Sequence, residues 1–376
     1  DKFMETIHRA THEDNFDDSW ELIDPHSHEV KKVVSARTLW VKLLQNRMET
    51  GEPYLMFEDA VNADLPDFQK RKGLYVNHSN LCSEITLATN EERTAVCCLS
   101  SVNLEYFDEW KNVPAFIPDL VRMLDNVLDY FIDNAPDQME KAKYSALRER
   151  SIGLGAMGFH AYMQKNSIPF ESIMAASKNY EMFKHIKQDA LNETRRLAVE
   201  RGACPDDDTC EVRNAHLLAI APNASSSIIC GNTSPSIEPF RANAYTQKTK
   251  SGSFLQKNKY LEQLLDKKGM NTDSVWKEIV ANKGSVQHLD ILTPEEKEVF
   301  KTAVEINQSW VVEHAAERQQ FVCQSQSVNL FFPPDVNKRD LHNVHMLAWA
   351  KNLKTLYYLR SEAISRADNV SSKVKR

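Results

Sequence analysis

NLCSE occupies residues 80–84 of this chain, and AVCCLS follows at residues 95–100. In an extended segment, side chains at positions i, i+2 and i+4 point the same way. Asn80, Cys82 and Glu84 would then form one row, in which a polar hydrogen-bonding group, a sulfur and an acid–base group are directed at a single point. This pattern predicts a catalytic site and places a second cysteine, Cys97, within reach of a short turn.

A single cysteine is nevertheless more often a small buried hydrophobic residue than a catalytic one. The Asn-x-Cys-x-Glu pattern by itself does not exclude that interpretation. Other features of the chain have to decide between a structural thiol and a reactive one.

The composition is that of an ordinary globular protein, with 376 residues, 42% hydrophobic and 26% charged. This length suits two domains or one large α/β barrel-type domain, and the lack of a visible linker or internal repeat favours one continuous catalytic domain. No run of about 18 apolar residues and no signal peptide is visible, so we expect no membrane partner. The net charge of −7 gives no general reason to bind nucleic acid.

The seven cysteines have no regular spacing and do not form the pattern of a secreted disulfide scaffold. We therefore expect a reducing, cytoplasmic environment. The chain begins with Asp1 rather than Met, and we expect it to be a fragment or a processed piece.

Hydrophobic spacing predicts helices that alternate with short apolar strands. The clearest helix start is at Thr293, which can cap the helix while Pro294 fits its first turn and Glu296 completes a capping box. Strands separated by helices are typical of a parallel α/β arrangement. We expect helices over residues 36–49, 117–134, 136–150, 177–201, 293–319 and 340–351, and strands over residues 94–104, 216–221 and 321–332.

GLGAMG at residues 153–158 matches the G-x-G-x-x-G pattern of dinucleotide-binding proteins. That fold requires an apolar strand directly before the first glycine. The preceding residues 144–151 are charged and have helical spacing, so we expect the glycines to allow tight helix packing instead.

Two further groups of polar residues suggest metal ligands at first sight. Cys204 and Cys210 flank the aspartates 206–208, but no histidine or close cysteine pair supports a metal site there, and a solvated acidic loop is expected. His342 and His345 lie on a predicted helix without a matching carboxylate, which favours surface or core roles. We predict no metal bound by this chain.

PNASSS at residues 222–227 follows a predicted apolar strand. Small residues and hydroxyls let backbone N–H groups approach an anion, and a helix start would add the positive end of its dipole. A phosphate cradle and a serine-rich helix cap are equally good interpretations of this loop.

Tyr357 and Tyr358 are adjacent near the end of the chain. Paired aromatic residues usually contribute packing. A phenol that loses an electron and a proton together also becomes a neutral radical, so the pair could carry one-electron chemistry. The dipeptide alone does not decide between these roles.

These motifs occur in one order along the chain, and jointly they resemble the large, catalytic subunit of class I ribonucleotide reductase. The resemblance runs from about residue 30 to about residue 360. The motifs that carry it are NLCSE (80–84), AVC (95–97) with Leu99 and Asn103, PNASSS (222–227), SIEP (236–239), QSVN (326–329) and TLYY (355–358).

The resemblance implies an α/β fold, namely the second half of a ten-stranded α/β barrel with a central finger loop that carries the active-site cysteine. Residues 1–376 would form a single region, the C-terminal part of the catalytic barrel domain, without the N-terminal half-barrel and the regulatory region. It also implies reduction of ribonucleotides, ribonucleoside diphosphates in the first place, to 2′-deoxyribonucleotides by thiyl-radical chemistry, which supplies DNA precursors.

The family likeness also implies residue roles. Cys82 would become the thiyl radical that abstracts the 3′-hydrogen of the ribose. Glu84 would take the proton of the 3′-hydroxyl, with Asn80 as its hydrogen-bonding partner. Cys97 would be one member of the redox pair whose partner lies in the absent first half, while Cys98 would point to the opposite strand face.

Radical entry and substrate binding are implied by the other motifs. Tyr357 and Tyr358 would relay the radical to the active-site cysteine. The residues implied in binding the substrate and its diphosphate are Asn80, Pro222, Asn223, Ala224, Ser225, Ser226 and Ser227.

The same likeness implies the partners. A small subunit with a di-iron or manganese centre would deliver the radical, so no cofactor is expected in this chain, and thioredoxin or glutaredoxin would act as reductant. A complementary N-terminal chain would complete the barrel. The family usually ends in a cysteine pair that reduces the active-site disulfide again, but no cysteine follows Tyr358 here, so that pair would be trimmed, lie on another polypeptide or be missing.

Three alternatives have distinguishing features. A cobalamin-dependent ribonucleotide reductase would not need Tyr357 and Tyr358. A glycyl-radical enzyme should have a glycine near its end, and residues 361–376 contain none. A catalytically inactive half-barrel could serve only as a binding or assembly protein, against which the intact cysteine, glutamate and tyrosine motifs argue.

Overall fold

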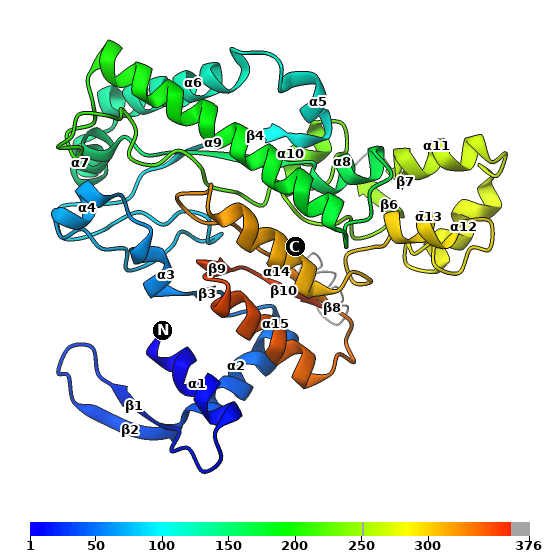
Figure 1. Ribbon diagram of the computed structural model, residues 1–376, viewed down its shortest axis with the longest axis horizontal. Coiled ribbons are helices and arrows are strands. Elements are labelled where there is room, and N and C mark those ends of the chain that lie inside the picture. Colours follow the sequence, from blue (N-terminus) through cyan, green and yellow to red (C-terminus); the bar gives the residue numbers. More distant parts are fainter. Residues whose placement is uncertain (250–251, 362–376) are drawn as a thin grey trace.

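The computed structural model describes residues 1–249 and 252–361, in which helices surround short strands (Figure 1). The helices are α1 (Lys2–His12), α2 (Ala36–Thr50), α3 (Glu58–Ala63), α4 (Asp67–Arg71), α5 (Phe107–Trp110), α6 (Phe116–Asn134), α7 (Glu140–Glu149), α8 (Phe159–Lys165), α9 (Ile173–Arg201), α10 (Ala224–Ile229), α11 (Lys259–Lys267), α12 (Asp273–Ala281), α13 (Pro294–Val299), α14 (Gln308–Gln319) and α15 (Lys338–Ala350). The strands are β1 (Ser19–Ile23), β2 (Val30–Ser35), β3 (Leu55–Met56), β4 (Cys98–Asn103), β5 (Ile152–Met157), β6 (Ala244–Thr249), β7 (Gly252–Lys257), β8 (Leu330–Phe332), β9 (Thr355–Leu356) and β10 (Leu359–Ser361).

Parallel pairing organises the centre of the molecule. β4 pairs with β5, and β8 pairs with β10, both in parallel. Isolated parallel bridges join Leu154 to Leu218 and Ile220 to Gln326. These pairs place β4, β5, residues 218–220 and residues 326–332 side by side in chain order. Because parallel strands need long crossover connections, helices fill the intervals between them, and the predicted mixed α/β class is confirmed.

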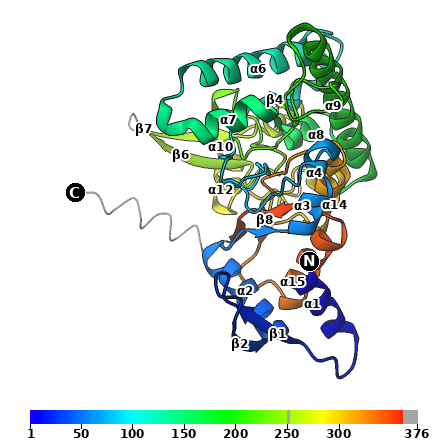
Figure 2. The ribbon, with the colours of Figure 1, turned by 90° about the vertical axis from the view of Figure 1, so that its left-hand side faces the viewer.

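Different helices and strands form the two ends of the molecule. Figure 2 shows α1, α2 and the β1–β2 hairpin together at one end, and α6 and α9 at the opposite end. The largest buried apolar cluster reaches from α1 and α2 through the parallel strands to α6 and α9. A smaller cluster lies among α11, α12 and α13. In the part of the chain that the structure describes, no helix combines the length and the apolar character needed to span a bilayer.

Most predicted helices are present with small changes at their ends. α2 ends at Gly51, whose φ of 86° is the left-handed geometry that favours glycine. α9 begins earlier than expected, because the Ser172 hydroxyl accepts the N–H of Ala175 and caps it. The last helix, α15, begins at Lys338 rather than Asp340.

The helix predicted over residues 293–319 is wrong in its length. The capping box of Thr293 and Glu296 is present, but α13 ends at Val299 and α14 starts separately at Gln308. Between them the Glu305 carboxylate accepts hydrogen bonds from the N–H and the hydroxyl of Thr302, at 2.7 and 2.8 Å. Such local side-chain bonds offer the backbone an alternative to the helix.

The glycine motif lies in a strand, so the predicted helix packing is wrong. Every residue of β5 is buried. A Cβ atom on Gly155 would lie 2.6 Å from the carbonyl oxygen of Ala219 in the neighbouring segment. The charged run before it is α7, which ends where Arg150 adopts a φ of 47°. The glycines therefore permit close approach of two backbones.

The acidic loop is solvated only in part, because Asp208 is exposed as expected whereas Asp206 and Asp207 are buried. Asp206 is fully buried and accepts hydrogen bonds from Arg93 at 2.6 and 3.0 Å and from Arg148 at 3.0 Å. Asp207 accepts backbone N–H groups from Glu211 and Val212, both at 2.8 Å. The carboxylates therefore organise the loop, and no cluster of metal-binding side chains is found among the described residues.

Gly155→Ala should lower the free energy of unfolding by about 1–3 kcal/mol, because the added methyl group meets a backbone carbonyl that cannot turn away. Urea unfolding followed by circular dichroism measures this change. Ser100→Ala in the adjacent strand β4 adds no atom and should stay within about 0.5 kcal/mol of the unmodified chain. Equal stabilities for the two variants would contradict the packing role of Gly155.

Candidate active site

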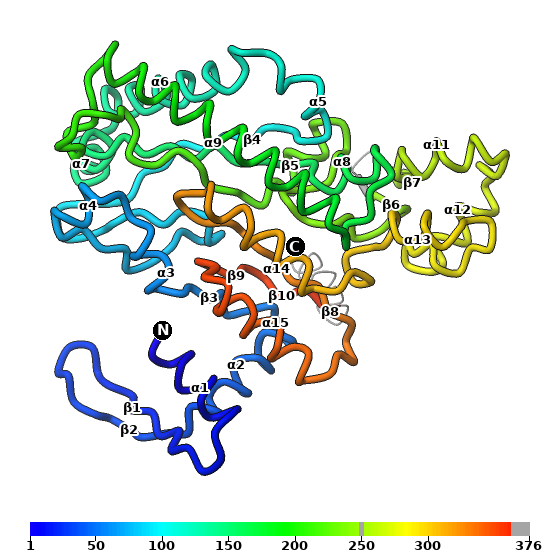
Figure 3. The backbone as a smooth tube through the Cα atoms, viewed as in Figure 1, coloured from blue at the N-terminus to red at the C-terminus, as the bar shows by residue number. Residues whose placement is uncertain are grey.

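Cys82 lies in a tight turn, and the predicted extended row is wrong. The N–H of Ser83 donates to the carbonyl of Asn80 at 3.1 Å, and Ser83 has a φ of 69°. The side-chain oxygen of Asn80 accepts the N–H of Ile85 at 3.0 Å. Residues 72–97, between α4 and β4, contain no helix or strand, and Figure 3 traces their path through the molecule. Asn80 therefore closes the turn that presents Cys82.

Two hydroxyls and one backbone N–H anchor this loop to residues 325–327 and to β9. The Ser327 hydroxyl lies 2.5 Å from the carbonyl oxygen of Cys82 and 3.2 Å from the Glu84 carboxylate. The Thr355 hydroxyl donates to the carbonyl of Ser83 at 3.0 Å. The N–H of Ser325 donates to the carbonyl of Glu84 at 2.9 Å. The QSVN and TLYY motifs thus hold the cysteine loop in place.

Tyr357 meets Cys82 directly. Its hydroxyl donates to the Cys82 sulfur at 3.4 Å, and its ring centroid lies 4.4 Å from that of Tyr358. Burial, followed by the bond to Cys82, raises the pKa of Tyr357 above its ordinary value. The phenol therefore keeps its proton at neutral pH, and it becomes a neutral radical only if that proton leaves together with the electron.

Tyr54 belongs to the same group of rings, although the sequence patterns do not indicate it. Its ring centroid lies 4.6 Å from that of Tyr357 and 4.9 Å from that of Tyr358. The contact arises because β3, which follows Tyr54, pairs antiparallel with β9. Only knowledge of this long-range pairing could have revealed it.

Glu84 is buried, with 3% of its surface exposed. Its carboxylate shares the Ser327 hydroxyl with the carbonyl oxygen of Cys82. The turn therefore brings an acid–base group, a thiol and a phenol into one small region. Such a set can exchange protons and hydrogen atoms with a bound molecule.

Cys97 and Cys98 lie in different surroundings. Cys97 packs with Ile85 just after the Cys82 turn, whereas Cys98 packs against the large core. The side-chain amide of Gln324 donates to the Cys97 sulfur at 3.3 Å. Burial raises the pKa of the Cys97 thiol, although the bond from Gln324 acts in the opposite direction. A Cβ atom on Gly153 would lie 3.1 Å from the same sulfur.

The PNASSS loop leads into the short helix α10. The Asn223 amide nitrogen lies 3.0 Å from the Ser101 hydroxyl and 3.2 Å from the carbonyl of Ala156, so the loop is fixed at the carboxyl ends of β4 and β5. Ser227 is buried and its hydroxyl donates back to Ala224 at 3.1 Å. The residues of this loop with exposed side chains are Ala224, Ser225 and Ser226, while Pro222 and Asn223 are partly buried.

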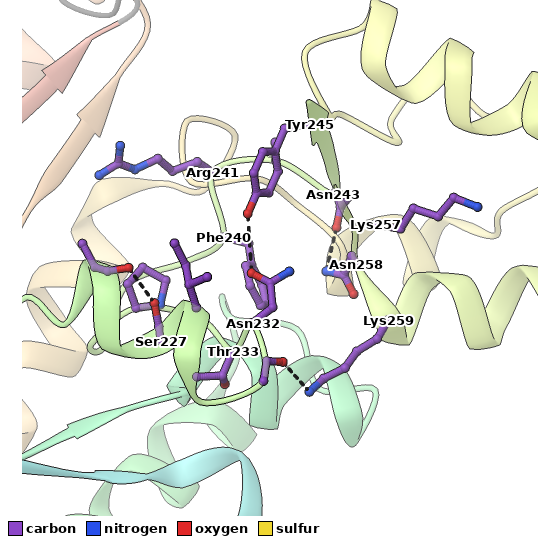
Figure 4. Close-up of a pocket in the computed structure, with 15 residues that line it drawn as sticks. Ser227, Asn232, Thr233, Phe240, Arg241, Asn243, Tyr245, Lys257, Asn258 and Lys259 are labelled. Carbon is purple, nitrogen blue, oxygen red and sulfur yellow. Dashed lines mark hydrogen bonds between the residues drawn. The ribbon is translucent and has the colours of Figure 1, made fainter. Parts of the chain in front are cut away.

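A cavity of about 530 Å³ lies between α10 and the β6–β7 hairpin (Figure 4). Ala224 and Ser227 of the PNASSS loop line it, together with Tyr245 and Lys259. Lys259 donates to the carbonyl of Gly231 at 3.5 Å. Neither the cysteines nor the tyrosine pair lines this cavity, so it is separate from the region around Cys82.

Comparison with known proteins identifies the family. The model of the family described as "Ribonucleotide reductase, barrel domain" matches residues 1–209 and 206–359. This chain belongs to that ribonucleotide reductase family. Its geometry agrees: a solved structure, the alpha subunit of the class Id ribonucleotide reductase of Actinobacillus ureae, superposes with a TM-score of 0.85 at 40% identity, over 97% of this chain and 65% of that one.

Viral proteins are among the similar sequences. The ribonucleoside-diphosphate reductase large subunit of Invertebrate iridescent virus 3 is 50% identical over 354 residues, which are 93% of this chain and 56% of that protein. The putative large subunit of Frog virus 3 is 49% identical over 364 residues, 96% of this chain and 63% of that protein. The ribonucleotide reductase chain described here therefore spans somewhat more than half the length of these relatives.

The environment of Cys97 predicts slow alkylation. Because burial raises its pKa, little thiolate is present near neutral pH, and we expect iodoacetamide to modify Cys97 at least about tenfold more slowly than the exposed Cys210. Mass spectrometry of timed samples measures both rates. In urea the two rates should become similar, and equal rates in the folded chain would contradict the protection that partial burial gives to Cys97.

Proposed function

We propose that this chain carries the radical-bearing part of a ribonucleoside-diphosphate reductase, which converts ribonucleoside diphosphates to 2′-deoxyribonucleoside diphosphates. The contact between the Tyr357 hydroxyl and the Cys82 sulfur at 3.4 Å is the observation that carries the proposal. It joins a group suited to one-electron transfer to a group suited to hydrogen abstraction. The viral relatives, which are ribonucleoside-diphosphate reductase large subunits by name, supply the substrate class.

The reaction begins when Cys82, as a thiyl radical, abstracts the 3′-hydrogen of the ribose. Glu84 takes the proton of the 3′-hydroxyl, and the 2′-hydroxyl leaves as water with a proton from the pair formed by Cys97 and a partner cysteine. In all, this pair supplies two electrons and two protons and becomes a disulfide, while Glu84 returns its proton to the 3′-oxygen. The 3′-hydrogen returns from Cys82, which regenerates the thiyl radical. The Ser327 hydroxyl supports this assignment because it fixes the Glu84 carboxylate beside the Cys82 backbone.

The radical enters through Tyr358 and Tyr357 and comes from a small subunit with a di-iron or manganese centre. Ring contact at 4.4 Å supports electron transfer between the two phenols. The contact with Cys82 supports the final hydrogen-atom transfer. A cobalamin-dependent enzyme would have no use for this stack of tyrosines.

The diphosphate is bound by the PNASSS loop. Ser225 and Ser226 are exposed and can donate hydroxyl hydrogen bonds, and Asn223 fixes the loop at the carboxyl ends of parallel strands. Ligands of α/β folds bind at that edge of the sheet. Asn80 contributes to the sugar site by holding the turn of Cys82.

The parallel strands form the second half of a ten-stranded barrel, and the cysteine turn is its finger loop. A complementary N-terminal segment supplies the first half-barrel, the regulatory region and the redox partner of Cys97. Thioredoxin or glutaredoxin reduces the resulting disulfide.

Cys82→Ser should abolish reduction, by at least about a thousandfold, because a serine hydroxyl does not form a comparable radical. The assay measures deoxynucleotide formation by this chain with an N-terminal half of the large subunit and a small subunit. Nucleotide binding should be unchanged, and Cys230→Ser at an exposed position should remain active. Turnover by Cys82→Ser at the unmodified rate would show that Cys82 does not carry the radical, whereas an inactive unmodified chain would favour the alternative of a half-barrel that only binds.

Tyr357→Phe should reduce turnover by at least about a hundredfold, because the ring still packs but the hydroxyl that exchanges a proton is lost. Electron paramagnetic resonance should show the small-subunit radical persisting after substrate is added. Tyr130→Phe, at a side chain that is 71% exposed, serves as the control and should turn over normally. Normal turnover of Tyr357→Phe would remove the relay role.

A further inference from the structure

Three tyrosines, rather than two, form one cluster of rings. The tyrosine cluster consists of Tyr54, Tyr357 and Tyr358, whose ring centroids lie 4.4, 4.6 and 4.9 Å apart. β3 and β9 are antiparallel with Leu55 opposite Leu356. The next residues in this register are Tyr54 and Tyr357, so the backbone itself sets the two rings against each other.

A buried arginine fixes Tyr54 in this position. The Arg47 guanidinium is fully buried and donates to the carbonyl of Pro53, directly before Tyr54. It also donates to the carbonyl of Tyr357 at 3.1 Å and to the His345 ring at 3.1 Å. One rigid cation therefore joins the two backbone segments that carry the cluster.

The hydroxyl of Tyr54 links the cluster to an exposed carboxylate. It donates to Glu52 at 3.2 Å, and the Glu52 side chain is exposed. Burial raises the pKa of Tyr54, and the neighbouring Tyr358 raises it further. The Tyr54 and Tyr358 rings are in edge contact, with centroids 4.9 Å apart. A chain of hydroxyl groups thus leads from Tyr358 through Tyr54 to Glu52 and the solvent.

Tyr358 needs such a path if it is oxidised. A phenol that loses only an electron becomes a positively charged ring, and the Arg360 guanidinium lies 4.3 Å from the centroid of this ring. Two positive charges at that distance repel each other. The hydroxyl of Tyr357 is occupied by Cys82. The proton of Tyr358 therefore requires an acceptor of its own.

We propose that Tyr54 and Glu52 are proton-transfer residues that accept and return the proton of Tyr358 during radical entry. The oxidant is a tyrosyl radical of the small subunit, which gains the electron from Tyr358. The O–H bond of Tyr358 breaks and its proton moves to the Tyr54 oxygen, while the proton of Tyr54 moves to the Glu52 carboxylate. Tyr358 becomes a neutral radical and Glu52 a neutral acid. Reverse transfer returns each proton.

The different roles of Tyr54 and Glu52 follow from their different surroundings. Tyr54 keeps its proton because its pKa is raised, so it cannot be the final base and acts by passing protons on. Glu52 is exposed and can serve as the base. The inference rests on the proposed radical relay and adds a proton path that the relay itself does not specify.

The test uses this chain with the N-terminal half of the large subunit and the small subunit. Tyr54→Phe and Glu52→Gln should each lower deoxynucleotide formation by at least about tenfold. This is a small effect for the loss of a proton-transfer group, because water can partly replace the missing group. Decay of the small-subunit radical should slow, and the solvent deuterium isotope effect on turnover should increase. Glu52→Asp retains a carboxylate and should restore most of the rate.

The chain offers a matched control. The Tyr75 hydroxyl donates to Glu58 at 2.7 Å, the same chemical pair at the surface but with no ring contact to the cluster. Tyr75→Phe and Glu58→Gln should turn over normally. The proton path is overturned if Tyr54→Phe and Glu52→Gln match these controls, or if Glu52→Asp is as slow as Glu52→Gln.

The two levels of the proposal fail in different ways. If Cys82→Ser remains active, the radical mechanism is wrong and the proton path falls with it. If Cys82→Ser and Tyr357→Phe are inactive while Tyr54→Phe turns over normally without a change in isotope effect, the relay stands and only the proton path is wrong.

Discussion

The hydrogen bond from the Tyr357 hydroxyl to the Cys82 sulfur joins side chains that are 275 residues apart in the sequence. Much of the surrounding structure serves to fix its two ends. Ser327 and Thr355 hold the backbone of the cysteine turn, and Arg47 holds the backbone of Tyr357. Hydrogen-atom transfer depends steeply on distance, so a phenol and a thiol are useful together only when both are fixed by rigid neighbours.

The need to fix Tyr357 and Cys82 rigidly also gives a role to motifs that do not contact either side chain. Asn329 accepts the N–H of Tyr358 at 3.0 Å and donates to Glu238 at 2.5 Å. Glu238 is buried, and its burial raises the pKa of this carboxyl. The SIEP and QSVN motifs are distant in sequence but meet behind the tyrosine pair. They orient its backbone through buried polar contacts, which are costly to break.

Local patterns indicate the cysteine, the tyrosine pair, the capping box at Thr293 and the alternation of helices with parallel strands, because each depends on neighbouring residues. The same patterns mistake residues 80–84 for an extended row, since the side chain of Asn80 replaces a backbone partner and closes a turn. They also miss Tyr54, whose contacts exist only once β3 pairs with β9. Residues far apart in sequence leave no periodic signal for such a pairing.

Burial raises the pKa of both the Tyr357 phenol and the Cys97 thiol, and this shared effect suits the proposed chemistry in two ways. A phenol that keeps its proton can always exchange a hydrogen atom with the neighbouring sulfur. A thiol that keeps its proton reacts slowly with oxidants and disulfides from solution. In the proposed reaction, Cys97 would therefore retain its electrons until a radical forms on the substrate. The partial burial that makes this thiol unreactive in the resting protein would protect the reducing equivalents that the proposed reaction needs.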